Sequence, residues 1–220
     1  MTKTAVIALN GNLHAEKNEY KKFLRNLDAT FIAADGGALL LEKIGLNADI
    51  ILGDLDSLDK RDIERFKNKK IDIIKYPVEK NETDGELAIN YCIKNDYDKV
   101  ILIFALGGRF DQQFANIFLL EYAKKNNLKA EIREAFLEIA LVDGNKTFND
   151  KKEWGLSLLP LDKKVENVSI KGCKYSLDSF DLLRNKTRGI SNVICKDKAR
   201  ISHEKGELLY ILNNNMHISC

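Results

Sequence analysis

The stretch that decides the fold reads Ile50-Ile51-Leu52-Gly53-Asp54-Leu55-Asp56-Ser57. Its apolar run predicts a buried strand, and Gly53 marks the point where the chain leaves the sheet. Asp54 and Asp56 then stand at the carboxyl end of that strand, which is where open α/β sheets place their ligands. Two carboxylates about 4 Å apart repel by about 4 kcal/mol at an effective dielectric of 20. A hard cation between them removes this repulsion, so the stretch indicates a magnesium site beside a phosphate; a solvated turn is the alternative.

Strands and helices alternate on both sides of this stretch. Further strands are expected at Thr4–Leu9, Thr30–Ala34, Ile71–Tyr76 and Val100–Phe104. Apolar residues at helical spacing lie between them, and a Thr-x-x-Glu capping box at Thr83 predicts the start of one helix. This alternation is typical of a parallel, Rossmann-like sheet between helices, joined by right-handed crossovers.

Helical periodicity disappears after Asn126-Asn127. Leu128–Val142 predicts one bent strand or two, and five short strand-like runs follow at Trp154–Leu159, Val165–Ile170, Ser191–Cys195, Ala199–His203 and Leu208–Leu212. Regularly spaced short strands indicate an all-β sandwich or barrel. We therefore expect two domains, an N-terminal α/β domain over residues 1–130 and a C-terminal all-β domain over residues 131–220.

Composition excludes several classes of protein. The 220 residues are 45% apolar and 31% charged, which describes an ordinary soluble globular chain. The 35 Lys and Arg against 33 Asp and Glu leave a net charge of +2, so no global field points to nucleic acid or to a membrane. The four cysteines form no CxxC pair, and the first apolar run is too short for a signal peptide. These features predict reduced thiols and a cytoplasmic location.

Five aspartates follow the pattern of the opening stretch, each just after a predicted strand or at the start of a predicted helix: Asp35, Asp54, Asp56, Asp84 and Asp111. In a parallel sheet these positions converge on one edge, where so many carboxylates would destabilise the fold unless cations bind. Glycines beside them, namely Gly11, Gly36, Gly37, Gly53, Gly107 and Gly108, allow backbone N–H groups to approach a phosphate. With positive charge from Lys80 and Arg109, the set predicts a site for a magnesium polyphosphate.

Each of these residues also has a purely structural interpretation. Asp35 could cap the following helix, and Asp84 lies in a first helical turn, where the helix dipole favours a carboxylate anyway. Arg109 could form an exposed ion pair with Asp111, which would contribute little. Neither a GxxxxGK[ST] nor a GxGxxG motif occurs, so the sequence indicates neither a P-loop protein nor a standard dinucleotide binder.

The order and spacing of these motifs resemble the thiamine pyrophosphokinase family. The resemblance is carried by Ala34-Asp35-Gly36-Gly37-Ala38, Gly53-Asp54-Leu55-Asp56-Ser57, Lys80-x-x-Thr83-Asp84-x-Glu86 and Gly107-Gly108-Arg109-x-Asp111. It continues in the second half, through Gly155-Leu156-Ser157-Leu158-Leu159-Pro160, Gly172-Cys173-Lys174-Tyr175 and Thr187-Arg188-Gly189-Ile190-Ser191-Asn192. The match covers nearly the whole chain.

The resemblance implies an enzyme that transfers pyrophosphate from ATP to the hydroxyl of thiamine and releases AMP. By that analogy Asp54, Asp56 and Asp84 hold magnesium, and the catalytic set is Lys80 and Arg109 on the phosphates with Asp111 orienting or deprotonating the hydroxyl. The nucleotide pocket would be formed by Asn10, Gly11, Asp35, Gly36, Gly37, Thr83, Gly107 and Gly108. Ser191 and Asn192 would contact thiamine across a homodimer interface.

The chain departs from the family pattern at two positions. Asn81 stands where an aspartate is common, and Gln112 stands where a histidine is frequent. Glutamine can donate and accept hydrogen bonds but cannot act as a general acid or base near neutral pH. These two positions leave open a non-catalytic sensor of nucleotide or thiamine. Because Asp-x-Asp is common to several chemistries, another magnesium-dependent phosphoryl or nucleotidyl transferase, or a phosphohydrolase, also stays open.

Overall fold

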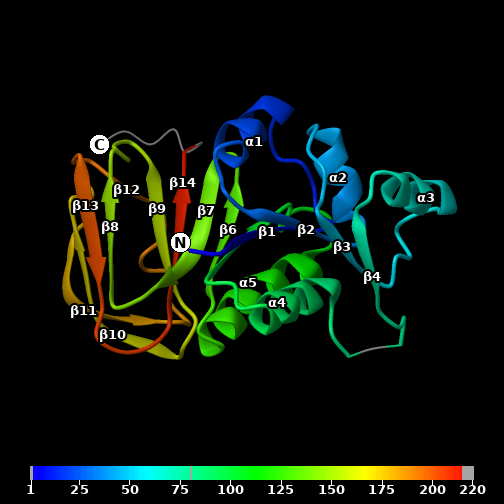
Figure 1. The fold of residues 1–220 in the computed structure, drawn as a ribbon. Coiled ribbons are helices and arrows are strands. Elements are labelled where there is room, and N and C mark those ends of the chain that lie inside the picture. The colour runs from blue at the N-terminus through cyan, green and yellow to red at the C-terminus, as the bar shows by residue number, and fades with distance from the viewer. Residues whose placement is uncertain (1, 80, 215–220) are drawn as a thin grey trace. The chain divides into compact units, whose positions relative to one another are not determined.

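A computed structural model describes residues 2–79 and 81–214 of the chain. It divides the chain into two compact units, Met1–Ala135 and Phe136–Cys220, which are described separately here (Figure 1). The first is an α/β unit and the second is all-β, so the predicted fold class is confirmed.

The first unit is built on a six-stranded, fully parallel sheet. Its strands are β1 (Thr4–Ala8), β2 (Thr30–Ala34), β3 (Ile50–Gly53), β4 (Asp72–Lys75), β5 (Lys99–Ile103) and β6 (Lys129–Glu134). Within the unit they run in the order β6-β5-β1-β2-β3-β4. The chain moves outward from β1 to β4 and then returns to pair β5 on the other side of β1. The order thus reverses between β1 and β5, and open α/β sheets bind their ligands at such a switch point.

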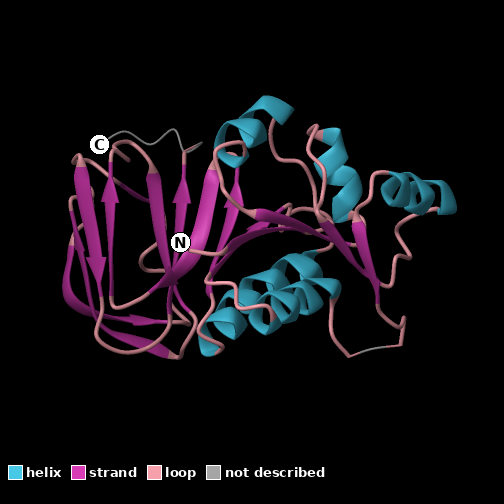
Figure 2. Ribbon diagram, viewed as in Figure 1, coloured by secondary structure: helices cyan, strands magenta, loops and turns pink. Residues whose placement is uncertain are grey.

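Helices cover both faces of this sheet (Figure 2). They are α1 (Lys17–Leu24), α2 (Gly37–Lys43), α3 (Lys60–Asn68), α4 (Asp84–Lys94) and α5 (Phe110–Lys125). Figure 1 shows α1 and α2 on one face and α4 and α5 on the other. Alternate strand residues explain the arrangement, because Val6 and Ala8 share one core cluster with Tyr20 and Leu41, whereas the side chains between them face the opposite way.

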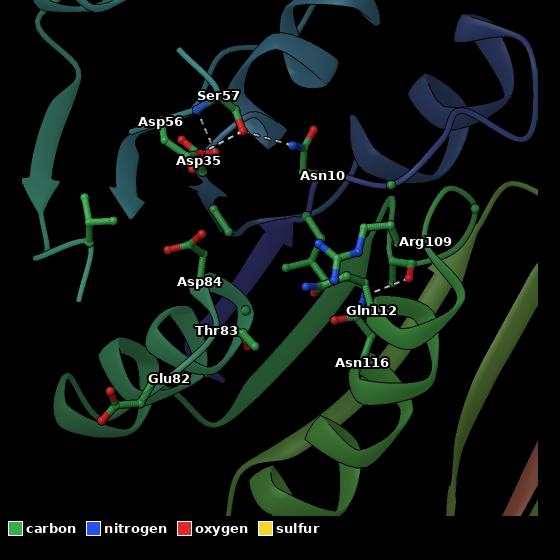
Figure 3. A pocket seen from close by; sticks show the side chains of 17 residues that line it. Asn10, Asp35, Asp56, Ser57, Glu82, Thr83, Asp84, Arg109, Gln112 and Asn116 are labelled. Atoms are coloured by element: carbon green, nitrogen blue, oxygen red, sulfur yellow. Dashed lines mark hydrogen bonds between the residues drawn. The ribbon is translucent and has the colours of Figure 1, made fainter. Parts of the chain in front are cut away.

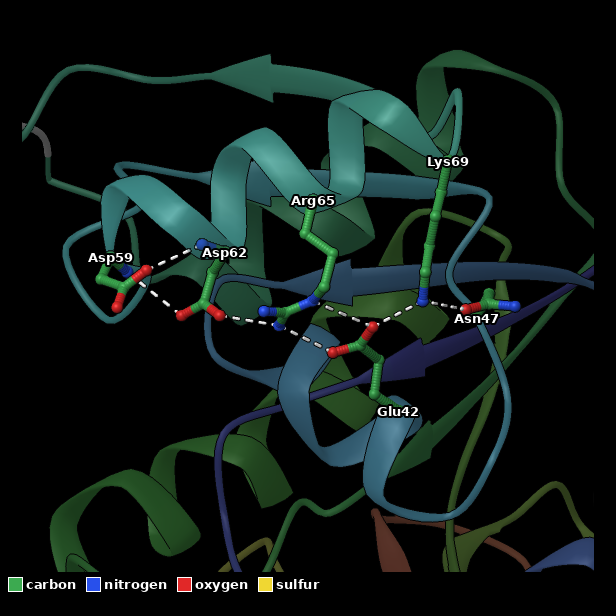
Figure 4. Close-up of polar contacts among 6 residues, drawn as sticks. All are labelled: Glu42, Asn47, Asp59, Asp62, Arg65 and Lys69. Carbon is green, nitrogen blue, oxygen red and sulfur yellow. Dashed lines mark hydrogen bonds and ion pairs between the residues drawn. The ribbon is translucent and has the colours of Figure 1, made fainter.

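An ion-pair network joins α2 to α3 at the surface (Figure 4). Glu42 accepts from Arg65 Nη2 at 2.8 Å and from Lys69 Nζ at 2.6 Å. At the start of α3, Asp59 and Asp62 form a reciprocal capping box, in which the Asp62 N–H donates to Asp59 Oδ1 at 2.7 Å. The basic side chains are about 40% exposed, so the network orients the two helices but contributes little stability.

The second unit is a sandwich of two antiparallel sheets. Its strands are β7 (Leu137–Val142), β8 (Asn145–Asn149), β9 (Gly155–Pro160), β10 (Lys164–Lys171), β11 (Leu177–Leu183), β12 (Asn192–Val193), β13 (Lys198–Ser202) and β14 (Leu208–Asn213). Within the unit the sheets have the orders β12-β9-β14-β7 and β11-β10-β13-β8. Both contribute side chains to a single core, in which Phe148 and Tyr210 meet edge to face with ring centroids 5.2 Å apart.

The strand predictions differ from the structure in a few places. Leu128–Val142 forms two strands, one in each unit. The sequence predicts a full strand over Ser191–Cys195, but the strand covers only Asn192–Val193, and Ile194 forms an isolated β-bridge with Cys173. β8 and β11 were not predicted at all. In β11 only Leu182 is buried, so the strand lacks the apolar alternation by which a half-buried strand is found in a sequence.

Two observations bear on the expected cellular environment. No helix within the described residues is long and apolar enough to cross a membrane. Cys92 and Cys173 carry free thiols, as the sequence predicts, and Cys220 lies outside the described residues.

Candidate functional site

A pocket of about 490 Å³ opens at the carboxyl ends of the parallel strands, at the switch point of the sheet (Figure 3). Loops after β1, β2, β3, β4 and β5, the first turn of α4 and the first two turns of α5 supply its walls. The residues that line this strand-end pocket are Leu9, Asn10, Gly11, Ala34, Asp35, Asp56, Ser57, Val78, Glu82, Thr83, Asp84, Gly85, Ala105, Gly107, Arg109, Gln112 and Asn116. The predicted convergence of motifs from separate strands is therefore present.

Three carboxylates meet beside this pocket and form an acidic cluster of Asp35, Asp54 and Asp84. One oxygen of each lies within 4.8 Å of the other two. Asp35 follows β2, Asp54 follows β3, and Asp84 is the first residue of α4. Gly53 makes the convergence possible, because a Cβ atom there would lie 3.1 Å from Asp84 Oδ1 and 3.2 Å from Asp35 Cβ.

Asp35 is the most buried member of the acidic cluster, with 3% of its surface exposed. Its Oδ2 accepts a hydrogen bond from the Ser57 N–H at 3.3 Å, whereas its Oδ1 has no hydrogen-bond partner in the described part of the chain. Burial raises the pKa of Asp35, and the hydrogen bond from Ser57 opposes that rise. A buried carboxylate oxygen without a donor is costly, and a cation is the ligand that would satisfy it.

Asp56 does not share in this convergence, although it was predicted as a magnesium ligand together with Asp54 and Asp84. Leu55 has a left-handed backbone (φ +67°), and the turn places Asp56 as an exposed residue on the pocket wall. There its Oδ1 accepts from the Ser57 hydroxyl at 3.3 Å. The cluster that could hold a cation among the described residues includes Asp35 instead, which the sequence assigned to the nucleotide.

The glycines have two different roles. Of those predicted to contact a nucleotide, Gly11 and Gly107 line the pocket. Gly36 and Gly37 are buried at the start of α2, where a Cβ on Gly37 would lie 2.1 Å from the Ala8 carbonyl oxygen. Gly37 therefore lets α2 approach β1 closely, whereas a Cβ on Gly36 would lie 2.6 Å from Asn10 Oδ1 in the loop after β1. Gly108 is exposed in open space with φ +72° and, like them, is absent from the residues that line the pocket.

On the opposite wall Arg109 and Asp111 form an ion pair. Arg109 Nη2 lies 2.5 Å from Asp111 Oδ2, and its Nε donates to Asp111 Oδ1 at 3.1 Å. Their side chains are 74% and 64% exposed, so this is the solvated pair that the sequence allowed as an alternative. The guanidinium of Arg109 lowers the pKa of Asp111. Arg109 lines the pocket, and Asp111 is held beside it.

Several wall residues were not predicted as site residues. Ser57, Glu82, Gln112 and Asn116 all line the pocket, and Asn116 Nδ2 donates to the Ala105 carbonyl at 2.7 Å. Asn116 lies in the second turn of α5, and no sequence motif includes it. Thr83 was predicted and is present, and its hydroxyl also caps α4 by accepting from the Glu86 N–H at 3.2 Å. Lys80 lies outside the described residues.

The two residues assigned to thiamine lie in the second unit. Asn192 is buried, and its side-chain amide donates to the Tyr175 carbonyl at 2.6 Å while its oxygen accepts from the Tyr175 N–H at 3.0 Å. Ser191 is exposed with φ +57°, and its N–H donates to Ser157 Oγ at 3.1 Å. Asn192 therefore fixes the Tyr175 loop, and Ser191 is an exposed residue next to it in the sequence.

Comparisons with known proteins match most of the chain. The family model described as thiamin pyrophosphokinase, catalytic domain, matches residues 20–132, and the one described as its vitamin B1 binding domain matches residues 147–208. The thiamine pyrophosphokinase of Bacillus subtilis is 25% identical over 183 residues, which cover 82% of this chain and 86% of that protein.

Solved structures show the same similarity of fold. The crystal structure of thiamine pyrophosphokinase from Bacillus subtilis superposes with a TM-score of 0.83 at 24% identity, covering 97% of this chain and all of that one. The structure of thiamin pyrophosphokinase from Geobacillus thermodenitrificans gives a TM-score of 0.81 at 25% identity and covers 97% of this chain and 99% of that one.

Proposed function

The chain belongs to the thiamin pyrophosphokinase family, and from this premise we propose that the strand-end pocket binds ATP together with magnesium. As a member of the family it is an ATP-dependent transferase that moves pyrophosphate to thiamine and yields thiamine diphosphate and AMP. The observation that carries the assignment of the site is the acidic cluster, because three carboxylates within 4.8 Å of one another repel and a cation between them would relieve that repulsion.

The residues present fit a magnesium ion. Carboxylate oxygens are its preferred protein ligands, and it is normally held by a few carboxylates together with phosphate oxygens. Asp35, Asp54 and Asp84 would offer one carboxylate oxygen each, and Asp35 has an oxygen, Oδ1, that no described donor satisfies. Asp56, on the pocket wall, would complete the acidic side. Bound magnesium neutralises phosphate charge that develops during transfer.

The nucleotide lies, in this proposal, against the loops after β1 and β5. Asn10, Gly11 and Gly107 present backbone and amide groups to it, Thr83 stands at the start of α4, and Gly36, Gly37 and Gly108 act indirectly by shaping these loops. The N-terminus of α4 adds a favourable dipole for the phosphate chain.

In this proposal the Arg109 guanidinium leaves Asp111 and binds a phosphate oxygen. Its fork is exposed and reaches the pocket, and a bidentate guanidinium suits the phosphate geometry. Asp111, released from Arg109 and exposed to solvent, accepts a hydrogen bond from the thiamine hydroxyl. We assign Asp111 to orientation of that hydroxyl, and Lys80 to the phosphates by resemblance. Transfer then depends on positioning and charge neutralisation without a covalent intermediate.

The remaining assignments rest on the family resemblance. Ser191 and Asn192 would form part of the thiamine site, Ser191 through its exposed hydroxyl and Asn192 by holding the Tyr175 loop. We also propose a homodimer and a cytoplasmic location. Size-exclusion chromatography with light scattering checks the first of these, and the mass of one chain would contradict it.

A product assay tests the function, and a variant of Asp54 tests the site. When the pure protein meets ATP, magnesium and thiamine, mass spectrometry should find AMP and thiamine diphosphate in equal amounts. ADP instead of AMP would indicate an ordinary kinase, and binding without turnover would indicate a sensor. Asp54→Asn should abolish turnover without changing the circular dichroism spectrum, whereas the exposed Asp28→Asn serves as the matched control and should retain activity.

A further inference from the structure

A second buried carboxylate lies behind the strand-end pocket. Glu134 ends β6 with 4% of its surface exposed, and it is not among the residues that line the pocket. Asp35 and Glu134 are the buried carboxylates of the described part of the first unit. The acidic cluster accounts for Asp35, but no step of pyrophosphoryl transfer uses Glu134. A buried carboxylate is costly unless donors satisfy it, so its partners indicate its role.

Both oxygens of Glu134 accept hydrogen bonds from the first unit. Oε1 accepts from the Ala105 N–H at 2.9 Å, and Oε2 accepts from the Tyr20 hydroxyl at 2.6 Å. Tyr20 is fully buried on α1, and its hydroxyl oxygen accepts in turn from the His14 N–H at 3.3 Å. One carboxylate therefore connects the loop after β5 to the segment that follows the loop after β1.

The segment held by Glu134 has a backbone that needs support. Phe104 is left-handed with φ +53° and β5 ends just before it, and the Ala105 N–H donates to the Glu134 side chain of the neighbouring strand β6. The Tyr20 ring packs on Phe104 with centroids 5.1 Å apart. A bulky residue in this conformation persists only where the surroundings fix it, and Glu134 supplies the acceptor that the ladder no longer provides.

The same segment is bonded to the pocket from its other side. The Phe104 carbonyl accepts from the Gly11 N–H at 2.8 Å, and the Leu106 carbonyl accepts from the Asn12 N–H at 2.8 Å. The Ala105 carbonyl accepts from Asn116 Nδ2 at 2.7 Å. Gly11, Ala105 and Asn116 all line the pocket. Movement of Ala105 would therefore displace three parts of the pocket wall at once.

We infer that Glu134 is a positioning residue for the nucleotide, acting through Ala105 and Tyr20 to fix the shape of the pocket wall formed by the loops after β1 and β5. The inference rests on the proposed function, since it takes the pocket to be the ATP site. It assigns Glu134 no contact with substrate. Replacement of Glu134 should change the affinity for the nucleotide. The acidic cluster on the opposite wall should keep its geometry, because β2, β3 and α4 hold it.

Two variants of Glu134 separate the hydrogen bonds from the side-chain volume. Glu134→Leu removes both acceptors and leaves two buried donors, the Ala105 N–H and the Tyr20 hydroxyl, without partners. Glu134→Gln keeps an oxygen for Ala105, and the Tyr20 hydroxyl can turn to accept from the new amide group. Glu131→Leu is the matched control, because Glu131 lies in the same strand and pairs with Lys99 away from the pocket wall.

The measurement is the Kd of the whole protein for α,β-methylene ATP with magnesium, by calorimetry, beside the KM for thiamine. We expect Glu134→Leu to raise that Kd at least tenfold, with the KM for thiamine within threefold of its original value. Glu134→Gln and Glu131→Leu should stay within threefold in Kd. An unchanged Kd in a folded Glu134→Leu protein overturns the inference, and so does an equal loss in Glu131→Leu, which would show general destabilisation.

A further variant keeps the inference testable if Glu134→Leu does not fold. Tyr20→Phe removes one hydroxyl and retains the ring against Phe104. We expect its Kd for the analogue to rise about threefold to tenfold, and an unchanged value would overturn the inference. Binding of the analogue to the unaltered protein distinguishes a wrong ATP site from a wrong role for Glu134. Failure of that protein to bind the analogue refutes the proposed ATP site, whereas tight binding that survives the Glu134 and Tyr20 changes refutes only the role of Glu134.

Discussion

Replacement of Asp35 by asparagine should have opposite effects with and without magnesium. Two unit charges 4.8 Å apart repel by about 3.5 kcal/mol at an effective dielectric of 20, and Asp35 faces two such partners in the acidic cluster. Asparagine removes that repulsion and keeps an oxygen for the Ser57 N–H. Asp54 and Asp84 are only partly buried, so solvent screens much of the repulsion. We expect the metal-free protein to gain about 1–2 kcal/mol of stability.

In magnesium the sign should reverse, because the variant loses one ligand of the cation. The assay is thermal unfolding by circular dichroism in EDTA and in magnesium, with Asp28→Asn as control. The Tm of the unaltered protein should rise on adding magnesium, that of Asp35→Asn should start higher in EDTA and rise little, and Asp28→Asn should follow the unaltered protein. Two results would refute the assignment of the cluster. One is a Tm of Asp35→Asn in EDTA below that of the unaltered protein, and the other is a rise in its Tm on adding magnesium as large as that of Asp28→Asn.

Three further predictions follow from the described contacts. Burial raises the pKa of Glu134 to about 7 from an ordinary 4.5, so the stability linked to its proton is complete below about pH 4.5 and is lost as the pH rises through about 7. Glu134→Gln should flatten that part of the stability profile in denaturant unfolding, by at most about 3 kcal/mol between the two limits; an unchanged profile would contradict the buried titration. Gly37→Ala should cost more than about 2 kcal/mol, since its Cβ would lie 2.1 Å from the Ala8 carbonyl oxygen, whereas Gly108→Ala meets open space and should cost only about 1–2 kcal/mol of left-handed strain; equal losses in urea unfolding would argue against close packing at Gly37. Arg109→Lys should lower pyrophosphate transfer at least about tenfold by removing the bidentate fork, and should leave the midpoint of urea unfolding unchanged because its ion pair with Asp111 is exposed; retained formation of AMP and thiamine diphosphate by mass spectrometry would remove Arg109 from the site.

The edge on which the acidic residues gather was predictable from the sequence. Parallel strands bring their carboxyl ends to one side of a sheet whatever their order, so Asp35, Asp54 and Asp84 could be expected together. Which aspartates point inward was not predictable. That depends on the left-handed turn at Leu55, which directs Asp56 onto the pocket wall and leaves Asp35 as the third member of the cluster.

Residues outside motifs could not be found in the same way. Asn116 reaches the pocket from within a helix, and Glu134 meets Tyr20 across 114 positions of sequence. Neither relation has a local signature, because both arise from the packing of separate elements. β11 escaped prediction for a related reason, since one buried residue gives no alternating pattern.

The acidic cluster draws its ligands from three separate segments of chain, the ends of β2 and β3 and the beginning of α4. A cation held there is a reversible cross-link between those segments, and its departure releases them together. Amide hydrogens near Asp35, Gly53 and Gly85 should therefore exchange with solvent more slowly as free magnesium rises. Local unfolding at this edge of the sheet would then depend on the concentration of free magnesium even before a substrate binds.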